Sequence, residues 1–139
     1  MKTLIRPTLA AILSLLTALA ASACGNGASA GRSVTLTAED NGSTVEVEVS
    51  DEIVITLESN ITTGFAWTLT TEPDADVLEL VDSEYRSPET DLLGAEGNEV
   101  WTFTATGEGT TSLELTYERS SGETAGEPFA LTVVVTPAG

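Results

Sequence analysis

Polar and apolar residues alternate along most of the chain after residue 33. Val45, Val47 and Val49 are separated by Glu46 and Glu48, and the same alternation of apolar and polar residues recurs in the later segments. Alternation with a period of two and one apolar face is typical of half-buried antiparallel strands, and no segment in this part has the spacing of an amphipathic helix. The pattern predicts eight strands, near residues 34–38, 44–49, 52–58, 65–71, 77–81, 99–105, 110–119 and 128–136.

Turn-forming pairs such as Asn41-Gly42 and Ser121-Gly122 separate these strands at short intervals. Many short strands at this spacing predict an all-β sandwich or barrel. Trp101 and Phe103 share one face of their strand, so we expect both in the core, where burial of two aromatic rings contributes much of the apolar area. We expect Trp67 to point into the sandwich as well.

Three stretches interrupt the alternation, at residues 59–64, 86–98 and 119–127. The first and third can lie at one end of a sandwich. The second is long and contains Gly94 and Gly97 close together. Long loops on a rigid scaffold are where binding residues usually lie, so these stretches are the candidate functional segments.

The beginning of the sequence resembles a bacterial lipoprotein signal peptide. Lys2 and Arg6 precede an apolar run over residues 9–21, which is too short and too rich in alanine to predict a membrane-spanning helix. The run is followed by small residues directly before Cys24, as in a lipobox, where the cysteine becomes the lipidated first residue. The alternative is an ordinary signal peptide cleaved after Ala-Ser-Ala, with Cys24 incidental.

These signals divide the chain into three parts. We expect a lipoprotein signal peptide at residues 1–23, a flexible tether at 24–33 and one folded domain at 34–139. A lipid on Cys24, palmitate included, would hold the exported domain at the cell membrane or in the cell envelope, outside the cytoplasm.

The composition is strongly acidic, with 22 Asp and Glu residues against 5 Lys and Arg and a formal net charge of −17. Such a surface repels nucleic acid and anionic lipid, so we expect no nucleic-acid partner and membrane association only through the anchor at Cys24. The charge either attracts a basic partner or serves solubility alone. We expect the domain to be a monomer.

Missing residue types argue against an enzyme. The chain has no His, and its one Cys is the lipidation candidate Cys24, so neither a Ser-His-Asp nor a Cys-His system can be built and zinc lacks its usual ligands. The single Lys, Lys2, lies in the predicted signal peptide, which removes Schiff-base chemistry from the mature chain. We therefore expect a protein that is not an enzyme and that has no cofactor and no metal.

A calcium site is an alternative reading of the acidic residues after the fourth predicted strand. Glu72, Asp74 and Asp76 are spaced by single residues, and Asp82 and Glu84 follow. Hard cations prefer such oxygens, but no Asp-x-Asp-x-Asp-Gly loop is present and acidic runs are usually solvated faces.

The three interruptions resemble the hallmark loops of the chagasin family of cysteine protease inhibitors. The first hallmark, Asn-Pro-Thr-Thr-Gly with an aromatic residue and a nearby Trp, is matched by Asn60, Ile61, Thr62, Thr63, Gly64, Phe65 and Trp67. The second, Gly-x-Gly-Gly, is matched by Gly94, Ala95, Glu96 and Gly97. The third, Arg-Pro-Trp, is matched by Arg119, Ser120 and Ser121. The spacing fits without gaps, and the resemblance covers nearly the whole domain after the tether.

The resemblance implies an immunoglobulin-like antiparallel β-sandwich of seven to eight strands. It also implies inhibition of papain-like cysteine proteases, whose active-site cleft would be blocked by three loops at one end of the sandwich. The loop at residues 60–64 would sit over the catalytic Cys-His pair, and its rigidity would limit the entropy lost on binding. All residues matched to the hallmarks, apart from Trp67, are implied to bind the protease.

The sequence departs from the family pattern at each loop. Ile61 replaces a proline that would fix φ, so the loop is less rigid in the free state, a penalty of about 0.4–1 kcal/mol. Glu96 replaces a glycine where close approach is expected. Ser120 and Ser121 replace Pro and Trp, and truncation of an interface Trp typically costs about 2 kcal/mol or more. A surface-binding module of the same fold that has lost inhibition therefore remains the alternative function.

Overall fold

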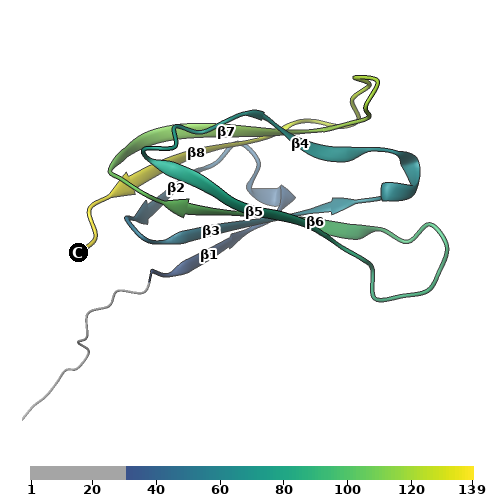
Figure 1. The fold of residues 1–139 in the computed structure, drawn as a ribbon, viewed down its shortest axis with the longest axis horizontal. Coiled ribbons are helices and arrows are strands. Elements are labelled where there is room, and N and C mark those ends of the chain that lie inside the picture. Colours follow the sequence, from purple (N-terminus) through teal and green to yellow (C-terminus); the bar gives the residue numbers. More distant parts are fainter. Residues whose placement is uncertain (1–30) are drawn as a thin grey trace, which may run out of the picture.

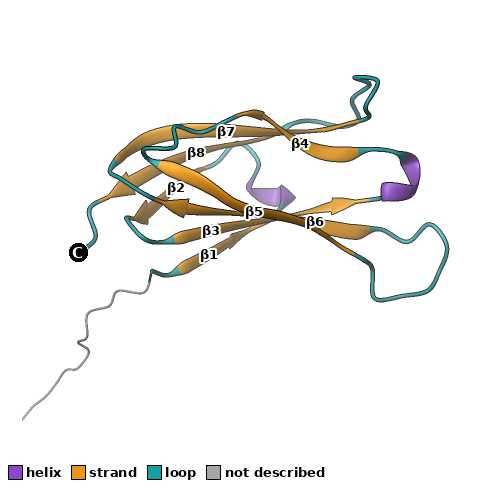
Figure 2. Cartoon of the chain, in the orientation of Figure 1, coloured by secondary structure: helices purple, strands orange, loops and turns teal. Residues whose placement is uncertain are grey.

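The computed structural model describes residues 31–139, which form two packed β-sheets (Figure 1). The strands are β1 (Ser33–Leu36), β2 (Thr44–Glu48), β3 (Glu52–Ser59), β4 (Ala66–Thr71), β5 (Leu78–Arg86), β6 (Gly97–Ala105), β7 (Gly109–Glu118) and β8 (Phe129–Thr136). All eight predicted strands are present, with bounds that agree within two residues except at the end of β5. The only helical elements in this part of the chain are two single 3₁₀ turns, η1 (Ala38–Asp40) and η2 (Ile61–Thr63) (Figure 2).

The eight strands are divided equally between the two sheets. Sheet A has the strand order β1-β3-β6-β5, and sheet B has the order β2-β8-β7-β4. Four of the six strand pairs are antiparallel, whereas β1 lies parallel to β3 and β2 lies parallel to β8. The predicted sandwich is confirmed, with the refinement that its first two strands are parallel to their neighbours. The turn η1 lies between β1 and β2 and carries the chain from sheet A to sheet B.

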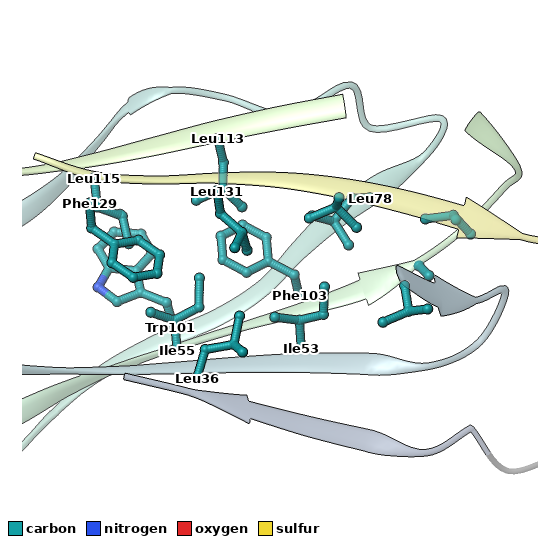
Figure 3. Packing of buried hydrophobic residues seen from close by; sticks show 14 of the residues in the cluster. Leu36, Ile53, Ile55, Leu78, Trp101, Phe103, Leu113, Leu115, Phe129 and Leu131 are labelled. Carbon is teal, nitrogen blue, oxygen red and sulfur yellow. The ribbon is translucent and has the colours of Figure 1, made fainter. Parts of the chain in front are cut away.

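The core consists of the inward-facing side chains of both sheets. Trp101 and Phe103 of β6 extend among Leu115, Phe129 and Leu131 of sheet B (Figure 3). Phe103 is 0% exposed and Trp101 is 8% exposed, which confirms that both aromatic residues are buried. The alternation seen in the sequence therefore corresponds to one face packed on the other sheet and one face in contact with solvent.

Strand β5 continues five residues past its predicted end because of a β-bulge. The register with β6 shifts between Leu80 and Asp82, so Leu80 pairs with Phe103 and Ser83 pairs with Trp101. One extra residue reverses the inside-outside phase of a strand, and the simple alternation is lost at this point. The residues after the bulge are polar but remain hydrogen-bonded to β6 as an edge strand.

Asp51 closes the end of the sandwich where β2 turns into β3. Its side chain is buried and accepts hydrogen bonds from the backbone N–H groups of Glu48 at 2.8 Å and Arg32 at 2.9 Å, and from Arg32 Nη2 at 3.4 Å. These bonds hold the pKa of Asp51 below its ordinary value, the Glu48 N–H having the largest effect and the Arg32 N–H the next, while burial opposes them.

Asp51→Asn is expected to lower the free energy of unfolding at pH 7. This loss of stability is expected to become progressively smaller as the pH falls below about 4. Because the folded-state pKa of Asp51 is lowered, its stabilisation is present above the unfolded-state pKa and is lost as the pH falls through the folded value. Urea unfolding of both proteins at pH 7 and pH 3 measures the difference. Asp82→Asn, on the exposed part of β5, is the control. An Asp51→Asn penalty that stays the same at both pH values contradicts this role.

The described domain begins slightly before its predicted start. Arg32 is bonded to Asp51 and β1 begins at Ser33, so these two residues of the predicted tether belong to the fold. Residues 31–139 include no helix long and apolar enough to span a membrane. The predicted signal peptide and Cys24 lie outside the described residues.

Candidate functional site

Three loops lie together at the end of the sandwich away from Asp51 (Figure 1). They are the central loop, residues 60–65 between β3 and β4, the second loop, residues 87–96 between β5 and β6, and the third loop, residues 119–128 between β7 and β8. Strands β3, β5 and β7 all run toward this end, which brings the three interruptions of the sequence pattern to one surface. We refer to this surface as the loop end.

Asn60 organises the central loop. Its Oδ1 accepts a hydrogen bond from the Thr62 backbone N–H at 3.1 Å and one from the Thr62 hydroxyl, so that it caps the turn η2. The Thr63 hydroxyl donates to the Asn60 carbonyl at 2.7 Å and accepts from the Phe65 N–H at 3.3 Å. These short-range bonds restrain the loop although Ile61 stands where proline would fix φ.

Gly64 ends the central turn in the left-handed region, with φ of +83°, and its N–H donates to the Ile61 carbonyl at 3.2 Å. Glycine adopts this conformation without the Cβ penalty that other residues incur. The polar groups of the loop bond to one another, and the residues at its tip remain exposed. Ile61 is 55% exposed, and Thr62 and Thr63 are exposed too, so the tip is compact and uncharged.

Four side chains stack beneath the central loop. The Phe65 ring lies 5.3 Å from the Tyr117 ring, and Tyr117 lies 5.1 Å from Trp67. The Arg119 guanidinium lies over the Phe65 ring, 4.5 Å from its centroid. The Tyr117 hydroxyl accepts a hydrogen bond from the Asn60 N–H at 2.9 Å, which ties this stack to the loop. Trp67 faces inward as predicted but is only partly buried, at the margin of the core.

A buried carboxylate joins the two sheets below the loop. Glu99 of β6 accepts hydrogen bonds on Oε2 from the Ser59 hydroxyl at 2.7 Å and the Trp67 N–H at 3.0 Å. Glu99 is 9% exposed and lies in phase with Trp101 and Phe103. It was not among the residues predicted for the site, although a charged residue in an otherwise inward-facing apolar column is a signal that the sequence contains. Glu99 fixes the spacing between the strands that hold the central loop.

The second loop touches the central loop and carries the most exposed apolar residues. Asn60 Nδ2 donates to the Gly94 carbonyl at 3.2 Å. Leu92 is 75% exposed and Leu93 is 101% exposed, so both present apolar surface beside the uncharged tip. Neither leucine was among the predicted contact residues.

Not all of the second hallmark is available for contact. Gly94 and Glu96 are exposed and Ala95 is partly buried, but Gly97 is buried in β6 opposite Ser59. A Cβ on Gly97 would lie 2.3 Å from the Arg86 carbonyl oxygen and 2.5 Å from the Tyr85 hydroxyl. Gly97 therefore allows β5 and β6 to approach one another and does not reach the surface.

Arg119 points toward the central loop. Its Nε donates to the Thr63 carbonyl at 3.2 Å and its Nη1 donates to Glu123 at 2.7 Å. Arg119 thus links the third loop to the central loop, a positioning role in addition to the predicted contact. Ser120 and Ser121 are exposed, with no aromatic side chain in residues 119–128 to extend the surface.

The chemistry of the loop end is that of a binding surface. Across residues 31–139, no group of three acidic or other ligand side chains converges on a possible metal position. Asp74, part of the calcium alternative, instead accepts the Asp76 N–H at 2.9 Å within a turn. The calcium reading therefore has no geometric support in the described part of the chain.

Tyr117→Phe is expected to lower the free energy of unfolding by about 1 kcal/mol and to weaken binding at the loop end up to about fivefold. The variant keeps the ring stack but leaves the Asn60 N–H without its partner, which loosens the central loop. Amide hydrogen exchange at Asn60 reports the loosening directly. Tyr85→Phe is the matched control, because its hydroxyl makes no hydrogen bond within residues 31–139. Unchanged exchange at Asn60 in the Tyr117 variant would show that the stack alone holds the loop.

Comparison with known proteins identifies relatives of this domain. The sequence model of "Chagasin family peptidase inhibitor I42" matches residues 46–133. Chagasin from Trypanosoma cruzi is 39% identical over 87 residues, which cover 60% of this chain and 79% of chagasin. The crystal structure of the cysteine protease inhibitor EhICP2 from Entamoeba histolytica superposes with a TM-score of 0.65 at 22% identity, covering 78% of this chain and 100% of EhICP2. The solution structure of amebosin gives a TM-score of 0.63 at 26% identity, covering 76% of this chain and 100% of amebosin.

Proposed function

The chain belongs to the chagasin family of peptidase inhibitors, and from this premise we propose that it inhibits papain-like cysteine proteases with its loop end. It acts as an inhibitor and not as an enzyme. The single observation that carries the proposal is the central loop itself: residues 60–65 combine an exposed, uncharged tip with a network of hydrogen bonds that restrains the backbone.

The mechanism is occlusion of the active-site cleft. The tip at Thr62 and Thr63 enters above the catalytic Cys-His pair of the protease, and the second and third loops contact the walls of the cleft. Because Asn60, the ring stack and Glu99 fix the loop before binding, little conformational entropy is lost in the complex. The central turn η2 does not present an extended peptide, so the protease cannot cleave the loop as it cleaves a substrate.

Binding to an active-site-labelled protease tests the occlusion mechanism. Papain with its catalytic cysteine alkylated by a peptidyl epoxide has a filled cleft, and it is expected to lose binding to the immobilised inhibitor by at least about 100-fold. Papain carrying only a methylthio group on that cysteine is the control, because its cleft remains largely open. Equal binding of free and peptidyl-labelled papain would place the contact outside the cleft and contradict the mechanism.

Ser121→Trp is expected to tighten inhibition by about tenfold or more, the equivalent of roughly 1.4 kcal/mol. Ser121 is exposed in the third loop beside the proposed contact surface, where the family pattern has Trp. Inhibition constants for papain measure the gain, with Ser112→Trp on the exposed face of β7 as the control. If both tryptophans change inhibition equally, the third loop does not face the protease.

A surface-binding module without inhibitory activity is the second candidate. The observation in its favour is the third loop, which presents Ser120 and Ser121 and lacks a large apolar anchor. A non-protease partner captured by the wild-type protein, but not by variants of all three loops, would support this candidate. Inhibition of papain-like enzymes by the unmodified protein would exclude this candidate, because it would show that inhibitory activity is retained.

We further propose that the protein is exported and anchored by a lipid on Cys24, with residues 25–30 as part of the tether. The sequence before Cys24 supports this location. Metabolic labelling with an alkyne-bearing palmitate is expected to mark the wild-type protein, and Cys24→Ser is expected to remove the label and release the domain from the membrane fraction. An unlabelled wild-type protein would count against the anchor.

A further inference from the structure

A groove of about 390 Å³ lies on the flank of the sandwich, outside the three loops. It is formed where β1 stops pairing with β3: the register ends at Leu36 opposite Ile55, and the chain then turns away into η1. The remaining edge of β3 has no neighbouring strand within residues 31–139. Ala38, Glu39, Thr56, Glu58, Trp67 and Asn98 line the space that is left.

The indole of Trp67 forms a fixed aromatic wall of this groove. Its Nε1 donates to the Glu58 carbonyl at 2.9 Å, and the ring packs on Tyr117 at 5.1 Å. Trp67 is only partly buried, so part of the indole remains accessible from the groove. An accessible and immobilised indole is a favourable surface for a planar cation.

Two carboxylates of the groove have no cation within the described part of the chain. Glu39 and Glu58 are both exposed and form no ion pair there. The three arginines of this part, Arg32, Arg86 and Arg119, are each paired with other acids. Residues 31–139 therefore supply no positive charge that complements the groove.

The groove is close to the loop end. Glu58 of β3 pairs with Asn98 of β6. In the sequence, Glu58 precedes Asn60 of the central loop by two residues, and Asn98 follows Gly97 by one residue. A protein seated on the three loops would reach the mouth of the groove with a side chain from the rim of its own contact surface.

We propose that this groove receives an arginine side chain from the rim of the inhibited protease, an inference that rests on the proposed function for the identity of the partner. The guanidinium lies on Trp67 and pairs with Glu39 and Glu58, while the aliphatic stem packs on Ala38 and the methyl of Thr56. Arginine fits better than lysine because its planar group stacks on an aromatic face and meets carboxylates with two parallel bonds. The contact selects proteases with a basic residue beside the cleft.

The site itself is tested without a protease. Titration of the ¹⁵N-labelled protein with N-acetyl-arginine methylamide is expected to shift the Trp67 indole N–H resonance, with the buried Trp101 indole as internal reference. The citrulline analogue has the same shape without the charge and is expected to cause no such shift. The double variant Glu39→Gln/Glu58→Gln is expected to abolish the response, whereas Glu46→Gln/Glu108→Gln, which removes two exposed charges elsewhere, keeps it. Equal shifts from both probes, no shift from either, or equal loss in both double variants would overturn the site.

Inhibition kinetics test the assignment of the partner. The groove variant is expected to raise the inhibition constant about three- to tenfold for a protease with a basic cleft rim, and the control variant is expected to change it less than twofold. Equal effects of the two variants would overturn the protease assignment. Absence of inhibition by the wild-type protein would instead contradict the proposed function, and the titration would still decide whether the groove binds a guanidinium.

Discussion

Thr62→Arg is expected to raise the inhibition constant for papain-like proteases by at least about 100-fold, a loss of roughly 3 kcal/mol of binding free energy. Thr62 lies at the exposed tip of the central loop, where the proposed complex leaves room for compact side chains only. A long cationic side chain at this position would clash with the cleft or be buried there without a partner. The variant loses the bond from the Thr62 hydroxyl to Asn60 Oδ1. The fold itself is expected to tolerate this change, because the Thr62 N–H still bonds to the same oxygen.

Thr110→Arg provides the control for this effect. Thr110 is exposed near the start of β7, at the end of the sandwich away from the loops, so the variant adds the same charge without altering the loop end. It is expected to inhibit as the unmodified protein does. Thermal unfolding of both variants checks that they are folded. Full inhibition by a folded Thr62→Arg protein would mean that the central loop does not enter the cleft.

Phe103→Ala is expected to lower the free energy of unfolding by about 3–5 kcal/mol, a large share of the roughly 5–15 kcal/mol that stabilises a typical domain. Phe103 is fully buried between the sheets, beside Ile53 and Leu131 (Figure 3). Ile53 and Leu131 belong to β3 and β8, which are hydrogen-bonded on both sides, so these neighbours cannot easily close the cavity. No disulfide can compensate within one chain, because the sequence contains a single cysteine.

Thr102→Ala is the matched control for the core. Thr102 is the neighbouring residue on β6, but its side chain faces away from the core, and a change of about 0.5 kcal/mol or less is expected. Chemical denaturation of both variants at the same pH measures the two penalties. Similar penalties would mean that the core tolerates loss of the Phe103 ring far better than its burial indicates.

The strand pattern could be predicted from the sequence because burial on one face leaves an alternation that needs no tertiary information. The prediction was wrong at the end of β5, where the bulge after Leu80 changes the phase of the strand. The partners of β1 and β2 could not be predicted either. Both strands lie at sheet edges, and strands of either orientation have the same alternation.

The position of the central loop was predicted, and so were Asn60, Thr63 and Arg119, but two other residues that hold the loop were not. Glu99 and Tyr117 belong to strands far from Asn60 in the sequence, and their bonds to the loop region depend on how the two sheets face one another. The charge of Glu99 in an inward-facing column was the only local signal of such a role. Arg119 was predicted as a contact residue for a protease, and its bond to Thr63 adds a structural role that spacing alone does not reveal.

The rigid central loop also bears on the departures from the family pattern. Replacement of proline by Ile61 removes one restraint on φ, but the bonds from Asn60, Thr63 and Tyr117 restrain the same turn. The loss of the third-loop aromatic residue has no comparable compensation in residues 119–128, whereas Leu92 and Leu93 supply exposed apolar surface in the second loop. The central and second loops therefore carry most of the proposed contact.

Steady-state inhibition of papain and of a cathepsin L-like protease by the unmodified protein tests the proposed function most directly. The inhibitor assignment predicts competitive, reversible inhibition with a constant below about 1 µM for at least one of the two enzymes, and recovery of the intact inhibitor after prolonged incubation. No inhibition of either enzyme at about 10 µM by a protein that melts cooperatively would contradict it.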